Sequence, residues 1–144
     1  MNTSKNMLIF LVDDDVVFLK ALEIDFMDSP HYEVQTFRTG ELCIANLSEK
    51  PDVIVLDYNL DGVEKNVLNG IETLDKIKEI DSTIAIIMLS GQDKIEVAVK
   101  CMRHDAFDYV VKSETAFMRV EKIIGTIQNI KRMEKELTWY MDRM

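Results

Sequence analysis

The sequence has few of the residues that build thiolate metal sites, disulfide scaffolds or histidine-based sites. It contains 2 cysteines and 2 histidines among 144 residues. Cys43 and Cys101 form no CxxC motif, and His31 and His104 are isolated from each other. Lone cysteines within apolar or helical stretches are typical of buried thiols in a reducing compartment. The sequence therefore gives no support for a zinc site or a disulfide-rich secreted fold.

Positive charge is also in short supply, with 17 Lys and Arg against 26 Asp and Glu and a net charge of −9. Proteins that grip nucleic acid or anionic membranes need clustered Lys and Arg, so neither is expected as a direct partner. The apolar run Met7–Val12 is stopped by Asp13 and is too short for a signal sequence or a membrane span. We expect a soluble, cytoplasmic protein.

Glycine and proline are scarce, at 5 and 2 residues, and no internal repeat occurs. Apolar runs alternate along the chain with segments whose apolar residues recur every three or four positions. The strand-like segments are 7–12, 32–37, 53–56, 84–89 and 107–111. The helix-like segments are 16–26, 41–47, 70–80, 95–102 and 115 to the end. Five strand–helix units predict an α/β protein with a doubly wound, five-stranded parallel sheet and an extended C-terminal helix.

Polar residues follow four of the predicted strands directly. They are Asp13, Asp14 and Asp15, then Asp57, then Ser90 and Gly91, and finally Lys112. In open parallel sheets the carboxyl ends of the strands form the ligand-binding edge, so these residues are expected to converge. Clustered carboxylates repel one another unless a cation neutralises them, and Mg²⁺ takes carboxylate oxygens while keeping several waters. Together with a lysine and a hydroxyl, this set suits phosphoryl transfer to an aspartate.

These residues also carry a family resemblance. The segments 12–15 (Val-Asp-Asp-Asp), 53–57 (Val-Ile-Val-Leu-Asp), 88–91 (Met-Leu-Ser-Gly) and 108–112 (Asp-Tyr-Val-Val-Lys) resemble the receiver domain of two-component response regulators. One such motif is weak support, but all four in order make the resemblance specific over residues 7–132. It implies a CheY-like, flavodoxin-like fold and a phosphorylation-controlled signalling switch without turnover of a separate substrate.

The resemblance implies that Asp57 accepts a phosphoryl group from a sensor histidine kinase or a phosphotransfer protein. Asp57 would also belong to an Mg²⁺ site, with Asp14 binding the ion directly and Asp13 binding it mainly through water. Asn59 would contribute its backbone carbonyl to the same ion.

The resemblance likewise implies that Ser90 and Lys112 hold the phosphoryl oxygens. Tyr109 would be an aromatic switch that turns inward when Ser90 moves toward the phosphoryl group, although a half-buried core tyrosine is an open alternative. For Asp15 we expect a structural role, as the cap of the helix that follows.

The loop at residues 58–69 departs from the family pattern. Leu60 and Asp61 stand where the family commonly has Met-Pro, and several residues precede Gly70 that the family lacks. We expect a longer, mobile loop at the rim that screens the acceptor or influences kinase choice, and a tolerated surface insertion is the alternative.

Two further positions differ from the family. Ser113 follows Lys112 where proline is usual, and a cis bond before a non-proline residue is costly, so a trans bond is expected. Asp105 stands where a glycine often ends the fourth helix, and aspartate is among the residues that tolerate a left-handed conformation.

The last helical segment is longer than a receiver requires. We expect a receiver domain over residues 1–132 and a helical extension over 133–144, which includes Trp139 and Tyr140. The extension is interpreted as a coiled coil or a linker to an output domain, with a frayed tail left open. A homodimer is expected through this helix or through the face formed by the fourth helix, fifth strand and fifth helix.

Three other functions are compatible with an α/β fold of this kind and differ in the residues that they need. A phosphatase with an aspartyl nucleophile needs a second aspartate two residues later, where this chain has Asn59. A flavin-binding flavodoxin needs a Ser/Thr/Gly-rich loop after the first strand, where the aspartates at 13–15 would repel the flavin phosphate. A degenerate receiver that serves only as a docking module remains the alternative.

Overall fold

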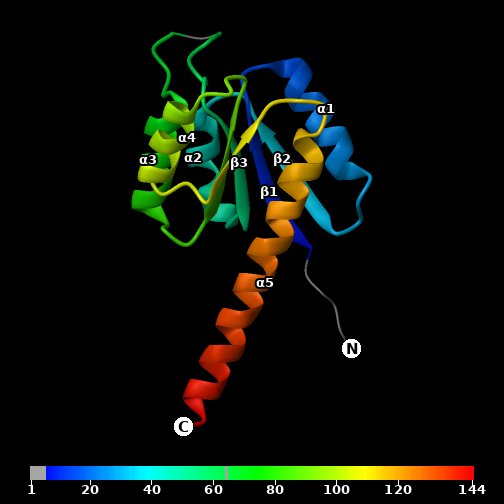
Figure 1. Cartoon of the computed structure of the whole chain (residues 1–144), viewed down its shortest axis with the longest axis vertical. Helices are drawn as coiled ribbons and strands as arrows, with labels where there is room; N and C mark the ends of the chain where they lie inside the picture. The colour runs from blue at the N-terminus through cyan, green and yellow to red at the C-terminus, as the bar shows by residue number, and fades with distance from the viewer. Residues whose placement is uncertain (1–5, 64) are drawn as a thin grey trace.

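The computed structural model describes residues 6–63 and 65–144, in which strands and helices alternate along the chain (Figure 1). The strands are β1 (Met7–Val12), β2 (Tyr32–Phe37), β3 (Val53–Asp57), β4 (Ala85–Ser90) and β5 (Asp108–Val111). The helices are α1 (Val16–Met27), α2 (Gly40–Ala45), the short 3-10 helix η1 (Leu47–Glu49), α3 (Gly70–Ile80), α4 (Ile95–Arg103) and α5 (Ala116–Asp142).

The five strands form one parallel sheet in the order β2-β1-β3-β4-β5. The chain first moves outward from β1 to β2 and then crosses to the other side of β1. This reversal of direction at β1 and β3 is the switch point at which ligands bind in doubly wound sheets. The predicted fold class is confirmed.

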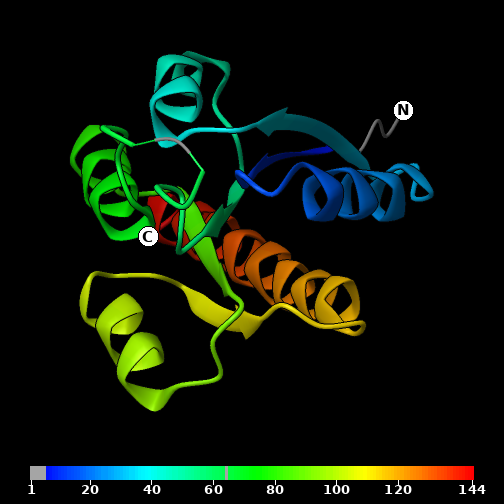
Figure 2. The same cartoon turned by 90° about the horizontal axis from the view of Figure 1, so that it is seen from above.

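Helices cover both faces of the sheet (Figure 2). Helices α2, α3 and α4 pack on one face, and α1 and α5 pack on the other. Successive residues of the central strands alternate between the two cores, so that Phe10 and Ile54 face the first helix layer while Ile9 and Val55 face the second. Burial on both faces explains why these strands are continuous apolar runs.

The predicted boundaries agree with the structure to within a residue or two at most ends. The second helix is shorter than expected because it ends at Ala45, and the 3-10 helix η1 follows. Asp105, just after α4, has a φ of 70°, which confirms the expected left-handed conformation. The bond between Lys112 and Ser113 is trans, since the described residues contain no cis peptide bond.

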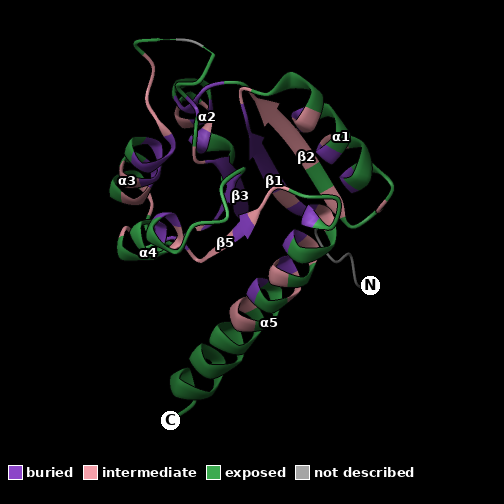
Figure 3. Ribbon diagram, turned by 45° about the horizontal axis from the view of Figure 1, so that its top comes forward, coloured by how far each residue is buried: buried purple, intermediate pink, exposed green. Residues whose placement is uncertain are grey.

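Helix α5 continues well beyond the sheet (Figures 1 and 3). Its buried residues, Ala116, Val120, Ile124 and Ile127, all lie in the first half, and every residue from 132 onward is exposed. The expected extended helix is therefore confirmed, and it is helical through Asp142. No helix in the described part of the chain is long and apolar enough to span a membrane.

Candidate phosphoryl-acceptor site

The pairing of β1 with β3 brings two buried aspartates together. Val12 lies opposite Leu56, so Asp13 and Asp57 end up side by side at the carboxyl edge of the sheet. Asp14 joins them, and the three side chains each offer an oxygen within 4.8 Å of the others. Figure 2 views the molecule from this end. The predicted convergence of these three residues is thus seen in the structure.

Asp57 is a buried carboxyl group with a strongly perturbed pKa. Asp57 is only 2% exposed. Burial, and then the neighbouring charge of Asp13, raise the pKa of Asp57 from 3.8 to about 7, while Lys112 and the N–H of Asn59 act in the opposite direction. That N–H donates to Oδ1 of Asp57 over 3.2 Å. The carboxylate form of Asp57 is consequently costly until more positive charge is supplied.

Lys112 is the positive charge already present at the site. Its Nζ lies 2.7 Å from Oδ2 of Asp13 and 3.4 Å from Oδ1 of Asp57. Apart from this ion pair with Lys112, the buried Oδ2 of Asp13 has no hydrogen-bond donor among the described residues. One lysine therefore partly neutralises two buried carboxylates, and no second cation is present among the described side chains that contact them.

The donor set fits a hard divalent cation. Asp14 is the most exposed of the three aspartates, so an ion bound there can keep waters on its outer side. A Cβ placed on Gly62 would lie 3.3 Å from Oδ2 of Asp14 and 3.4 Å from the carbonyl oxygen of Asn59. Both oxygens therefore lie next to Gly62, on the same side of the site. Carboxylate and carbonyl oxygens are the ligands that Mg²⁺ prefers, and no thiolate or imidazole is part of this group.

Ser90 and Tyr109 are linked through one residue of the loop after β4. The Ser90 hydroxyl accepts a hydrogen bond from the N–H of Gln92 over 3.0 Å, and the Tyr109 hydroxyl donates to the Gln92 carbonyl. Ser90 is fully buried, whereas Tyr109 is partly exposed. A Cβ on Gly91 would meet nothing within 4 Å, so the approach beside Ser90 is open.

Asp15 has the structural role that the sequence predicts. Its Oδ1 accepts from the N–H groups of Val17 and Phe18, which makes it the N-cap of α1. Its own N–H donates to Oδ1 of Asp13 over 2.9 Å. Asp15 thus fixes Asp13 as well as the start of the helix.

Sequence reasoning missed several contacts around the site. A Cβ on Gly70 would lie 2.5 Å from the Asp57 carbonyl oxygen and 2.6 Å from the backbone of Tyr58, so only glycine fits there. Leu60 is fully buried in the core, which anchors the start of the 58–69 loop. Both residues were noted from the family pattern, but no sequence signal gives their contacts.

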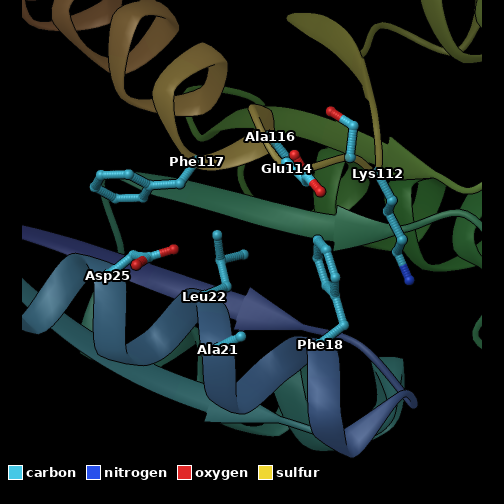
Figure 4. A pocket seen from close by; sticks show the side chains of 9 residues that line it. Phe18, Ala21, Leu22, Asp25, Lys112, Glu114, Ala116 and Phe117 are labelled. Atoms are coloured by element: carbon cyan, nitrogen blue, oxygen red, sulfur yellow. The ribbon is translucent and has the colours of Figure 1, made fainter.

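A cleft of about 420 Å³ opens beside the acidic cluster, between α1 and the start of α5 (Figure 4). Phe18 lies at its end nearest the site, and Nζ of Lys112 sits 4.8 Å from the centre of the Phe18 ring. Positive charge over an aromatic face is favourable, so Phe18 helps to hold Lys112 toward the carboxylates. This contact also was not predicted.

Comparison with known proteins agrees with the geometry. The sequence-family model of the response regulator receiver domain matches residues 9–124 of this chain. The nitrogen assimilation regulatory protein NtrX of Azorhizobium caulinodans is 29% identical over 131 residues, which are 88% of this chain and 28% of that protein. A protein-glutamate methylesterase/protein-glutamine glutaminase of Bacillus subtilis is 38% identical over 107 residues, 71% of this chain and 28% of that protein. The chain thus spans less than a third of these relatives.

Among solved structures, the receiver domain of NtrX from Brucella abortus superposes with a TM-score of 0.73 at 28% identity, covering 83% of this chain and 96% of that one. A CheY-like receiver domain protein from Methanospirillum hungatei has the same fold, with a TM-score of 0.74 at 21% identity and coverage of 90% and 99%. With a family match over most of its length and the acidic pocket in place, this chain belongs to the response regulator receiver domain family.

Proposed function

We propose that the chain accepts a phosphoryl group on Asp57 from a phosphohistidine of a sensor histidine kinase or phosphotransfer protein, and acts as a phosphorylation-controlled switch. The observation that carries this proposal is the single cluster formed by Asp13, Asp14 and Asp57 with Lys112 in contact with two of them. In such a cluster the carboxylates can bind a cation, and the lysine ammonium can bind the negatively charged phosphoryl group.

In the proposed reaction an oxygen of the Asp57 carboxylate attacks the phosphorus of the phosphohistidine. A P–O bond forms as the P–N bond breaks, and the leaving imidazole keeps the electron pair and takes up a proton. Asp13, Asp14, Asp57 and the Asn59 carbonyl would hold Mg²⁺, which when bound neutralises charge on the phosphoryl oxygens. The ammonium group of Lys112 lies where it can donate to one of those oxygens.

Ser90 and Tyr109 are proposed to transmit the change. The Ser90 hydroxyl accepts from the N–H of Gln92, so a movement of Ser90 toward the phosphoryl group would act on Gln92 through this bond. Gln92 is also the residue whose carbonyl accepts from Tyr109. Movement of Ser90 therefore loosens the outward position of Tyr109, which supports its role as the switch residue.

The test is incubation with acetyl phosphate and Mg²⁺, followed by intact-mass measurement. We expect wild type to gain the mass of one phosphoryl group and Asp57→Asn to gain none. Asp61→Asn is the matched control, because Asp61 is an exposed carboxylate close in sequence and outside the cluster. No added mass in wild type, with Mg²⁺ binding absent too, would favour a docking module over an acceptor.

The remaining assignments extend this proposal. We assign the receiver to residues 1–132 and a helical extension to 133–144, in a cytoplasmic protein that does not contact nucleic acid itself. A homodimer is proposed through the α4-β5-α5 face, on which Ile95 is 80% exposed and Met118 68%, or through the extension of α5. Apolar side chains exposed to this degree are typical of surfaces that partners cover.

A further inference from the structure

The inserted loop is closed at its base. The N–H of Gly70 donates to the Tyr58 carbonyl over 3.1 Å, so the loop leaves and rejoins the body at one place. Leu60 is buried in the core just inside that closure. The segment is consequently attached to the end of β3, at the site itself.

One backbone group of this loop contacts a member of the acidic cluster. The N–H of Val63 donates to Oδ2 of Asp14 over 3.0 Å, across 49 positions of the chain. This is the only hydrogen bond that the Asp14 side chain makes within the described residues. Gly62 supports the same contact, because the space of its missing Cβ lies 3.3 Å from that oxygen.

The C-terminal part of the loop is also held by hydrogen bonds to the body of the protein. The N–H of Leu68 donates to Oε2 of Glu41 in α2 over 2.9 Å. Asn69 and Glu72 then form a reciprocal capping box at the start of α3. The loop is therefore held on both sides of Val63.

We infer that the inserted loop is a positioning element for the cation site, in which the N–H of Val63 fixes the carboxylate of Asp14. The inference rests on the proposed function, since it assumes that Asp14 is a ligand of Mg²⁺. Asp14 is partly exposed and has no other hydrogen bond in the described structure to hold its rotamer. Donors behind a ligating carboxylate are known to set metal affinity, and their loss commonly costs 10–100-fold.

The same contact could instead act as a competitor of the ion. Two features favour positioning. The donor is a neutral N–H on one oxygen, Oδ2, and it leaves Oδ1 of Asp14 free for the ion. Val63 is 70% exposed, and the contact with Asp14 that the structure shows is made by its backbone N–H.

The test compares Val63→Pro with Val63→Ala. Proline removes the N–H, and the preceding Gly62 tolerates the restriction that proline imposes. Alanine keeps the N–H and removes only the exposed side chain. Binding of Mg²⁺ alone, without a phosphodonor, is followed by titrating MgCl₂ and recording the backbone amide NMR shifts of residues 12–15 and 57–59.

We expect Val63→Ala to bind Mg²⁺ as wild type does and Val63→Pro to bind about tenfold more weakly. Equal affinity of the two variants, or tighter binding by Val63→Pro, would overturn the inference. A wild type that binds no Mg²⁺ would instead refute the proposed metal site. Should Val63→Pro not fold, Gly62→Ala serves in its place, because its Cβ would lie 3.3 Å from Oδ2 of Asp14. The inference expects this crowding to displace the carboxylate and weaken Mg²⁺ binding, and an unchanged affinity would overturn it.

Discussion

Nζ of Lys112 lies 2.7 Å from Oδ2 of Asp13, a residue that is only 2% exposed. The distance to the proposed acceptor, Asp57, is longer at 3.4 Å. In this state the lysine therefore serves first as the counter-ion of Asp13.

Replacing Lys112 by methionine should destabilise the metal-free protein by about 3 kcal/mol at pH 8, because it leaves two buried carboxylates without their cation. The measurement is urea unfolding followed by circular dichroism. Added MgCl₂ should recover part of the loss. Lys20→Met is the control, since Lys20 pairs with Glu23 at the surface. This substitution should lower the free energy of unfolding by less than about 1 kcal/mol. Equal losses in the two variants would contradict this account of the site.

The raised pKa of Asp57 gives the stability a defined pH dependence. The folded state holds the Asp57 proton more tightly than the unfolded chain does, so stability is lost as the pH rises from near 3.8 through about 7. Asp57→Asn removes this penalty. In metal-free buffer at pH 8 the variant should be more stable than wild type by up to about 4 kcal/mol, since each pKa unit corresponds to about 1.4 kcal/mol, with the difference vanishing toward pH 4. A difference that is constant with pH in urea titrations would refute the assignment.

Tyr109 and Ser90 hold the two backbone groups of Gln92. Tyr109→Phe removes one hydrogen bond and should cost about 1 kcal/mol locally. A loss of about 1 kcal/mol makes local opening roughly fivefold more frequent, so amide hydrogen exchange of residues 91–94 should become roughly fivefold faster. Tyr58→Phe is the matched control, since Tyr58 packs against the core just after β3 and does not contact Gln92 through the bond that Tyr109 makes. Unchanged exchange in Tyr109→Phe would mean that the loop is held by other contacts.

The parts of the fold and site that were predictable follow strong, local patterns. Strands buried on both faces are continuous apolar runs, and the polar residue that ends each run is the residue at the sheet edge. The carboxyl ends of parallel strands share one edge, so the sequence alone predicts that Asp13, Asp57 and Lys112 lie together. The cap on α1 was predictable for a similar reason, because Asp15 directly precedes the helical pattern.

The contacts that were not predictable involve groups that every residue carries. The bond from Val63 to Asp14 and the bond from Leu68 to Glu41 both use a backbone N–H. Nothing in the side chains of Val63 or Leu68 indicates these partners, and the loop has no periodicity. That the loop is longer than usual was apparent from the sequence, whereas its attachment to Asp14 needed the structure. Its mobility stays a prediction.

The conformation of Asp105 gives a test of backbone strain. Its φ is 70°, a region that costs a non-glycine residue about 1 kcal/mol. Asp105→Gly should raise the free energy of unfolding by about 0.5 kcal/mol, because relief of strain is partly offset by the greater entropy of the unfolded chain. Asp105→Asn is the control for charge, since asparagine tolerates the same conformation. A glycine variant less stable than the asparagine variant would contradict the prediction.

The extension of α5 presents a regular apolar stripe. Ile130 and Leu137 are seven positions apart, as are Met133 and Tyr140, and the two pairs alternate at spacings of three and four. Met133, Leu137 and Tyr140 are 54–63% exposed. A seven-residue repeat of this kind on an exposed helix is typical of a coiled-coil seam.

A second copy of the chain is the partner that this stripe fits best, since an identical stripe supplies the complementary knobs and holes. Deleting residues 133–144 should therefore lower the mass measured by light scattering at high concentration from that of a dimer to that of a monomer. Leu137→Glu in the full chain should have the same effect, because it places a charge within the seam. Thr138→Glu adds the same charge one position away, outside the stripe, and should leave the dimer intact.

If the full chain is monomeric at every concentration, or if both glutamate variants dissociate equally, the extension does not dimerise through this stripe. Dimerisation that survives the deletion would place the contact on the α4-β5-α5 face instead.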